Sequence, residues 1–216
     1  MNDRPTIDLL LERMRPVQQD LEREFDRLLE EKRAQFQYSI RRGKVVFEKQ
    51  ARRMQRRQRT GLWRYVRETP LAYLLSAPLI YGMIMPLLVL DLSITVYQQI
   101  CFRIYRIPRV RRGEYLAMDR HRLGYLNAIE KLNCVYCSYA NGLMAYAREV
   151  TARTEQFWCP IKHARRTRGA HHRTQYFLDY GDAEAWRRKL QVVRVHWPDV
   201  EADAPGAVER DSEGGR

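Results

Sequence analysis

The sequence predicts an all-α protein that is attached to a membrane. Three observations lead to this fold class. Residues 70–102 form a stretch of 33 residues with one charged side chain, Asp91. The stretches on both sides of it carry apolar residues at helical spacing. The chain of 216 residues has a formal net charge of +13, and its basic residues cluster beside the apolar stretch, which indicates an anionic partner.

Residues 1–40 predict an amphipathic helical arm. Its apolar side chains fall on one stripe, which acidic and basic residues surround. The stripe consists of Val17, Leu21, Phe25, Leu28 and Leu29. This pattern is typical of a helix that packs on another helix, and it leaves two partners open. The arm could dock on the C-terminal part of the chain, or it could bind a second protein or a second copy of itself.

Residues 41–69 predict a basic helix next to the membrane. Positions 41–67 contain 11 Lys and Arg residues and one acid, Glu48. Each basic residue near an anionic surface contributes about 1 kcal/mol to binding, so anionic lipid headgroups are the expected partner. Nucleic acid is disfavoured, because the basic residues border the apolar stretch and the chain shows no nucleic-acid-binding motif.

The membrane segment is predicted over residues 70–102, and positions 71–90 contain no charge. About 18 or more apolar residues indicate a membrane helix. One straight helix would be about 50 Å long against a hydrocarbon core of about 30 Å. Two interpretations remain open, a re-entrant or monotopic hairpin that turns near Pro86, and a single tilted span. Basic residues on both flanks favour the cytoplasmic side for both ends.

Residues 103–198 predict a cytoplasmic helical domain with a cysteine and histidine site. The spacing is Cys134-x2-Cys137-x21-Cys159-x3-His163. In a reducing compartment, such a cluster favours metal binding over a disulfide. Three thiolates and an imidazole make a Cys3His set that suits zinc, and iron or an iron–sulfur cluster would fit the same ligands. A metal-free thiol site and plain burial are the alternatives.

The neighbourhood of the cysteines predicts the second shell of this site. Residues 119–157 show helical periodicity, so Cys134 and Cys137 share one helix face. Glu130 lies one turn before Cys134, and Asn141 lies one turn after Cys137. Both are therefore expected to support the ligands.

Pro160 is expected to end this helix and to start another. Cys159 would then cap the new helix, where the helix dipole favours a thiolate. Glu155 lies one turn before Cys159 and is the third expected second-shell residue. From residue 199 to 216 the composition turns to Asp, Glu, Gly and Ala, which predicts a disordered acidic tail.

Four strings of the chain resemble a family of bacterial membrane-associated proteins of unknown function. They are PRVRRGEYLAMDRHRLGYLNAIEK, EKLNCVYCSYANG, ARTEQFWCPIKHARR and FLDYGDAEAWRRKL. The resemblance covers about residues 70–190. It implies a bacterial inner-membrane location and a defined site around the three cysteines and His163, and it supplies no substrate.

Three functions are consistent with these patterns. The first is a membrane-anchored protein with a Cys3His site, for which zinc is the expected metal, on the cytoplasmic face. The second is an enzyme at the membrane surface, with Cys159 as a reactive thiolate or metal-bound centre and Glu130 or Glu155 as general base. The third is a scaffold or assembly subunit that uses the N-terminal helix to engage a partner.

Overall fold

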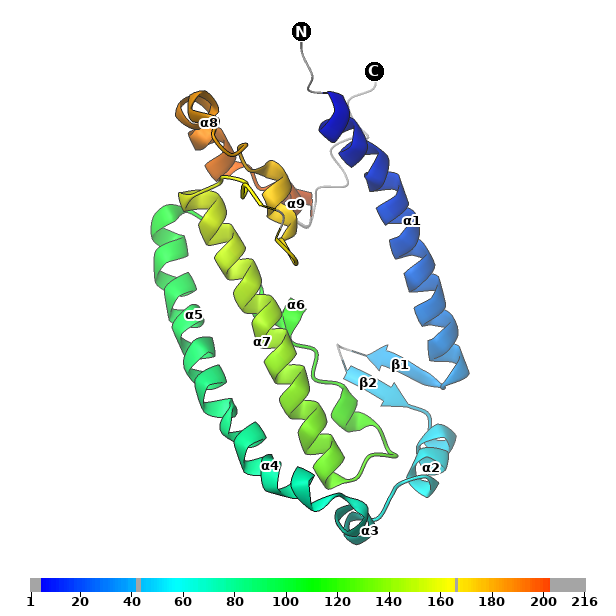
Figure 1. Ribbon diagram of the computed structural model, residues 1–216. Helices are drawn as coiled ribbons and strands as arrows, with labels where there is room; N and C mark the ends of the chain where they lie inside the picture. The colour runs from blue at the N-terminus through cyan, green and yellow to red at the C-terminus, as the bar shows by residue number, and fades with distance from the viewer. Residues whose placement is uncertain (1–4, 42–43, 166, 203–216) are drawn as a thin grey trace. The chain divides into compact units, whose positions relative to one another are not determined.

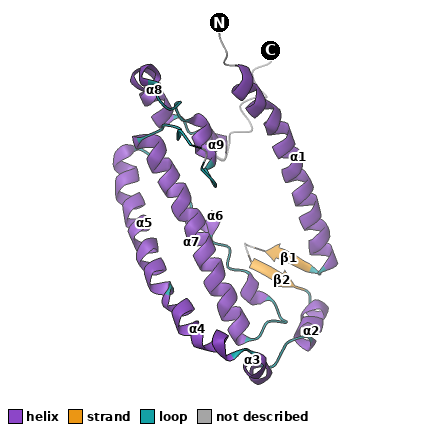
Figure 2. Ribbon diagram, viewed as in Figure 1, coloured by secondary structure: helices purple, strands orange, loops and turns teal. Residues whose placement is uncertain are grey.

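The structure is a computed structural model that describes residues 5–41, 44–165 and 167–202, and it is mostly helical (Figures 1 and 2). The chain divides into two compact units. Unit 1 consists of the residues up to Glu68 together with Asp119–Leu132. Unit 2 consists of Thr69–Met118 and the residues from Asn133 onward. Each unit is described below by itself.

Unit 1 begins with the long helix α1, Pro5–Gln35. The predicted arm is therefore helical, although it ends five residues before position 40. Four residues of its apolar stripe, Val17, Leu21, Phe25 and Leu28, are exposed. Unit 1 by itself thus leaves these four side chains uncovered, and the binding of a partner there stays a prediction.

The basic stretch that follows α1 is not one helix. The strands β1, Tyr38–Arg41, and β2, Lys44–Phe47, form an antiparallel hairpin in which Tyr38 is opposite Phe47. The short helices α2, Lys49–Arg57, and α3, Leu62–Glu68, come next. The single helix expected over 41–69 was wrong in two places. Its start forms a strand, because Val45, Val46 and Phe47 are β-branched or aromatic residues that favour a strand. The helix is also interrupted between Arg57 and Leu62.

Unit 2 is built around two helical rods that run side by side in the same direction (Figure 1). The first rod is α4, Leu71–Gly82, followed by α5, Ile84–Tyr105. The second is α7, Ala128–Trp158, of which the part from Asn133 on belongs to this unit. Aromatic contacts join them near both ends, because Tyr81 packs on Tyr136 and Tyr105 packs on Phe157.

A return segment, residues 106–118, follows α5 in unit 2. It contains the short helix α6, Arg112–Tyr115. Gly142 of α7 allows this segment to approach closely, because a Cβ atom at position 142 would lie 2.7 Å from the carbonyl oxygen of Tyr115. The core between the rods is formed by buried side chains that include Phe102, Leu143 and Tyr146.

No hairpin forms at Pro86. The rod breaks only at Met83, between α4 and α5, and then continues in the same direction (Figure 1). Proline has no backbone N–H for the carbonyl of the residue four positions before it, which here is Gly82, the last residue of α4. Pro86 itself lies in the first turn of α5, where a missing N–H costs nothing. Leu71–Tyr105 is thus one helix that is long and apolar enough to cross a membrane, by length and composition.

The C-terminal part of unit 2 packs against the end of α7. It contains a short 3-10 helix, His172–Tyr176, and the helices α8, Ala183–Val195, and α9, Pro198–Ala202. The expected disordered tail therefore does not begin at residue 199, because α9 covers that position. The remainder of the predicted tail, 203–216, lies outside the described residues.

Candidate functional site

The four predicted metal ligands do not come together in one chain. Cys134 and Cys137 lie in the second and third turns of α7, whereas Cys159 directly follows its last residue, Trp158. At 1.5 Å per residue, about 37 Å of continuous helix separates Cys134 from Cys159. A zinc–sulfur bond is about 2.3 Å long, so one ion cannot bind both pairs. This helix corrects the Cys3His arrangement within one chain, and zinc binding itself stays a prediction.

The backbone after Cys159 also differs from the expected helix. Ile161 pairs in parallel with Leu178 in an isolated bridge. Leu178 donates its N–H to the carbonyl of Pro160, and Lys162 donates to the carbonyl of Leu178. Because this pairing holds residues 160–162 extended, Cys159 caps no helix. Cys159 and His163 are both exposed.

Each predicted second-shell residue has a local partner instead. Glu130 accepts a hydrogen bond of 2.8 Å from the backbone N–H of Asn127, whose side chain accepts one of 3.0 Å from the N–H of Glu130. This reciprocal pair starts α7. Asn141 donates to the carbonyl of Cys137 in its own helix, and Glu155 lies 2.8 Å from Nε2 of His171. The pairing of Cys159 with Glu130 as a general base is excluded in one chain by the length of α7.

An ion-pair cluster at the end of α7 was not predicted. Arg173 is completely buried, and its Nε and Nη2 atoms lie 3.0 Å and 2.6 Å from Oε1 of Glu149. Arg153 donates to the same oxygen at 2.8 Å, and Arg173 also binds both carboxylate oxygens of Asp199. The guanidinium of Arg173 packs over the ring of Trp197 at 5.2 Å. Two buried arginines and two carboxylates therefore compensate one another.

This cluster changes the acidity of Asp199. Burial alone would raise its pKa, but the hydrogen bonds and the positive charge of Arg173, helped by nearby His172, more than offset burial. The pKa of Asp199 is therefore lower than its ordinary value. No local sequence signal identifies the cluster, because Glu149 and Arg173 are 24 residues apart.

Two carboxylates of the cluster, together with the neighbouring His172, form a group that could hold a metal ion. One ligand atom each from Glu149, His172 and Asp199 lies within 4.8 Å of the others. Both carboxylates already bind Arg173, so an ion would have to displace this buried guanidinium. The arrangement therefore favours a structural role in joining α7 to the C-terminal segment.

Asp91, the one charged residue in the apolar stretch, has two partners. Nη2 of Arg112 lies 2.6 Å from one of its oxygens, and the hydroxyl of Tyr139 donates to the same oxygen at 2.9 Å. Gln98 is buried on the same side of α5 and bonds both Tyr146 and the backbone of Val110. The polar side chains of α5 thus face α7 and the return segment.

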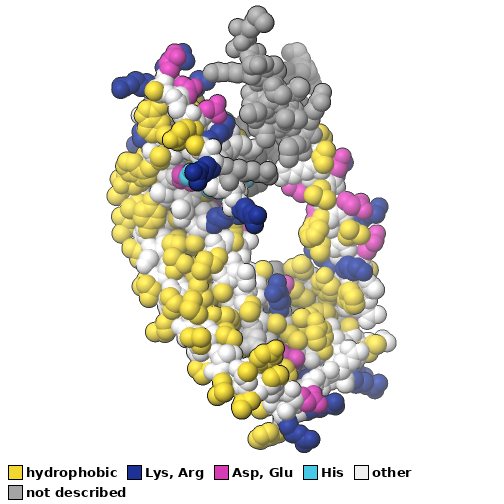
Figure 3. Space-filling model, viewed as in Figure 1, with side chains coloured by type: hydrophobic (Ala, Val, Ile, Leu, Met, Phe, Trp, Pro, Cys, Tyr) yellow, Lys and Arg dark blue, Asp and Glu magenta, His cyan; other side chains and the backbone are white. Residues whose placement is uncertain are grey.

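The opposite side of α4 and α5 is a continuous apolar surface, which we call the apolar row. Its members are Leu71, Leu75, Leu79, Met85, Val89, Leu92, Val96, Ile100 and Ile104, and each is at least 48% exposed. Within each of the two helices they recur every three or four residues, which places them along one side of that helix. Figure 3 shows hydrophobic side chains gathered over this part of the molecule.

Comparisons with protein-family models, with curated proteins and with solved structures give no match.

Proposed function

We propose that this chain is a monotopic membrane protein whose α4 and α5 helices lie along the surface of a lipid bilayer. The observation that carries the proposal is the apolar row, which is exposed along the whole 35-residue helix Leu71–Tyr105. Soluble proteins rarely leave an apolar surface of this length in water. Insertion into lipid removes this surface from water and supplies the main binding energy.

The length of the row favours an orientation along the membrane over a crossing. The helix is about 52 Å long, whereas the hydrocarbon core is about 30 Å thick. A perpendicular span over the charge-free positions 71–90 would leave Leu92, Val96, Ile100 and Ile104 in water. An orientation in the plane of the interface buries all of them together.

The opposite side of α5 supports the same orientation. It packs on α7 and on the return segment, where Arg111 and Glu114 are 72% and 60% exposed at their side chains. A crossing helix would bring these charges, which lie close to the Asp91–Arg112 pair, toward the lipid. When the helix lies flat, the apolar row faces lipid and the charged return segment faces water.

The flanking charges indicate which side of the membrane binds. Arg103, Arg106 and Arg109 lie at the C-terminal end of the apolar row in unit 2, and they are exposed. In the sequence, Arg64 and Arg67 precede it. Basic flanks on both ends support binding to the cytoplasmic leaflet, which is rich in anionic lipids. The resemblance to bacterial membrane-associated proteins supports a bacterial inner membrane as the location.

The depth of three members of the row tests this proposal. Leu79→Cys, Leu92→Cys and Ile104→Cys are each labelled with a fluorophore, in a background in which the four native cysteines are replaced by serine. The protein is bound to vesicles that contain nitroxide lipids at known depths. We expect all three positions to be quenched best by the same shallow nitroxide, at about 5–10 Å below the headgroups.

Glu114→Cys is the matched control, because its side chain lies on the return segment, and it should remain accessible to a water-soluble quencher. A crossing helix would give a different pattern, with one position near the bilayer centre and another in water. Failure of the protein to float with vesicles at all would reject membrane anchoring itself.

A further inference from the structure

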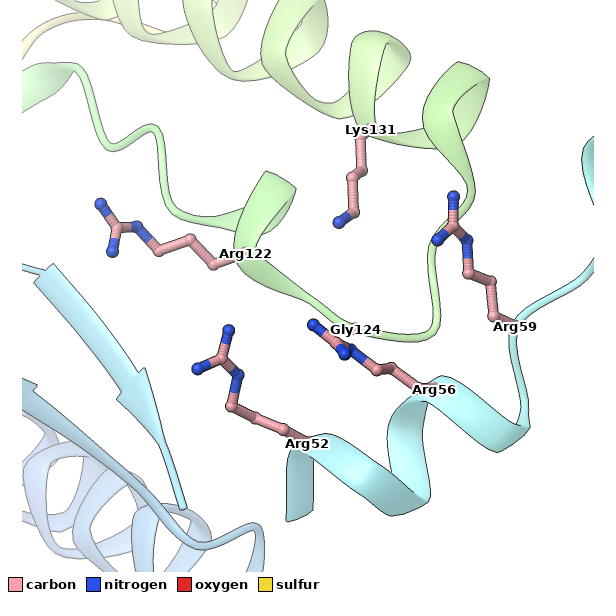
Figure 4. Close-up of a pocket in the computed structure, with 6 residues that line it drawn as sticks. All are labelled: Arg52, Arg56, Arg59, Arg122, Gly124 and Lys131. Carbon is pink, nitrogen blue, oxygen red and sulfur yellow. The ribbon is translucent and has the colours of Figure 1, made fainter. Parts of the chain in front are cut away.

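Unit 1 contains a cleft of about 420 Å³ that is lined by basic side chains. Arg52, Arg56 and Arg59 come from α2 and the residues just after it, Arg122 from the 3-10 helix Arg120–Arg122, and Lys131 from the start of α7. We call these five residues the basic cradle. Figure 4 shows Arg52 and Arg56 rising from α2 toward the loop at Gly124, and Lys131 reaching toward the same loop from α7.

Specific contacts hold the walls of the cradle in place. The backbone N–H of Gly124 donates to Oε1 of Gln55 on α2 at 2.9 Å. A Cβ atom at position 124 would lie 3.0 Å from that same oxygen, so the absence of a side chain lets the loop approach α2. The reciprocal bonds between Asn127 and Glu130 fix the first turn of α7, which directs Lys131. The cations are thus presented by a preformed frame.

The charges of the cradle are not compensated within the described part of the chain. None of its five side chains takes part in the ion pairs found there. Arg122 makes one long hydrogen bond of 3.4 Å, to the carbonyl of Val45. The described residues that line the cleft include no acid. Converging cations repel one another, and an anion with several charges relieves this repulsion.

We propose that the basic cradle binds a phosphate group that carries at least two negative charges. A phosphate offers several acceptor oxygens, which the planar forks of arginine bind in pairs, and lysine adds a point charge. Such a group can come from a phosphomonoester lipid headgroup or from a free phosphate or pyrophosphate. The inference goes beyond membrane anchoring, because the cradle belongs entirely to unit 1 and its ligand chemistry does not depend on the apolar row.

Nucleic acid also carries phosphate, but the cradle fits it less well. Single-stranded nucleic acid is bound by basic grooves that contain aromatic side chains on which bases stack. Among the described residues, no aromatic side chain lines this cleft of about 420 Å³. The lining residues therefore favour one phosphate group over an extended polyanion.

The helix α2 supplies matched variants for the test. Arg52 and Arg56 line the cradle, whereas Arg53 and Arg57 occupy the same helix and do not line it. The variants R52Q/R56Q and R53Q/R57Q have the same net charge. Titration calorimetry of the full chain in detergent uses inorganic pyrophosphate in one arm and nanodiscs that contain phosphatidic acid in the other, with phosphatidylglycerol nanodiscs as the reference for plain anionic charge.

We expect R52Q/R56Q to bind about ten- to a hundredfold more weakly than the wild type in the arm that gives binding, while R53Q/R57Q binds as the wild type does. Binding in either arm supports the phosphate site and identifies its source when R52Q/R56Q weakens it, R53Q/R57Q does not, and phosphatidylglycerol nanodiscs do not show the same difference. Three results would overturn the proposal. They are no saturable binding in both arms, equal weakening in both double variants, and tighter binding of a single-stranded oligonucleotide through Arg52 and Arg56. Membrane flotation is measured separately, so loss of one property does not imply loss of the other.

Discussion

The two units use clustered basic residues in opposite ways. In unit 2, Arg153 and Arg173 are buried, and Glu149 and Asp199 neutralise them. In unit 1, Arg52, Arg56, Arg59 and Arg122 are exposed, Lys131 is half-buried, and none of them is paired with an acid in the described residues. The net charge of +13 therefore does not indicate one common role for the basic residues. Paired arginines hold the fold together, and unpaired arginines are available for a ligand.

The largest effect is expected from Arg173→Met. This change leaves Glu149 with a buried charge that has lost its main partner, and breaking a buried pair in this way costs about 3–5 kcal/mol. Urea unfolding in detergent micelles measures the loss. Arg188→Met is the control, because Arg188 and Glu184 form an exposed pair on α8, and its loss should cost less than about 1 kcal/mol. Equal losses would mean that the cluster is not a structural element.

An intermediate effect on the free energy of unfolding is expected when the pH is lowered. Because the folded-state pKa of Asp199 is lower than its ordinary value, its ion pair stabilises the fold fully above the ordinary carboxyl pKa. This stability is lost as the pH falls through the lowered pKa. Urea unfolding between about pH 6 and pH 3 should show the loss, and Asp199→Asn should flatten it. If Asp199→Asn has the same pH dependence as the wild type, the ion pair between Arg173 and Asp199 does not cause the loss of stability in acid.

The smallest effect is expected from Arg56→Gln in unit 1. Loss of one cation from the basic cradle reduces repulsion, so the free energy of unfolding should stay within about 0.5 kcal/mol and rise slightly at low salt. Thermal unfolding at low and high ionic strength checks this. A destabilisation of more than about 2 kcal/mol would show that Arg56 is a paired structural residue, as Arg173 is, and the contrast between the units would fail.

The sequence predicted the helices of both units, but it did not predict which of their basic residues are paired with acids. Apolar periodicity correctly predicted a mostly helical chain, and the nearly uncharged stretch predicted the apolar segment that begins at residue 71. Whether that segment turns at Pro86 stayed open in the sequence, and the structure shows one long helix. The sequence already argued against the Cys3His site within one chain. The helix predicted over 119–157 separates Cys134 from Cys159 by most of its length. Residues far apart in the sequence come close together only when the backbone between them turns back.

Local patterns thus determined the helices, the apolar row and the position of the basic residues, because each depends on neighbours within a few turns. Tertiary structure alone decided which charges are paired. Glu149 meets Arg173 because the chain folds back after α7. Arg52 and Lys131 line one cleft because Gln55 and Gly124 join α2 to a distant loop. Electrostatic energy depends on distance in space, and the order of residues along the chain does not supply that distance.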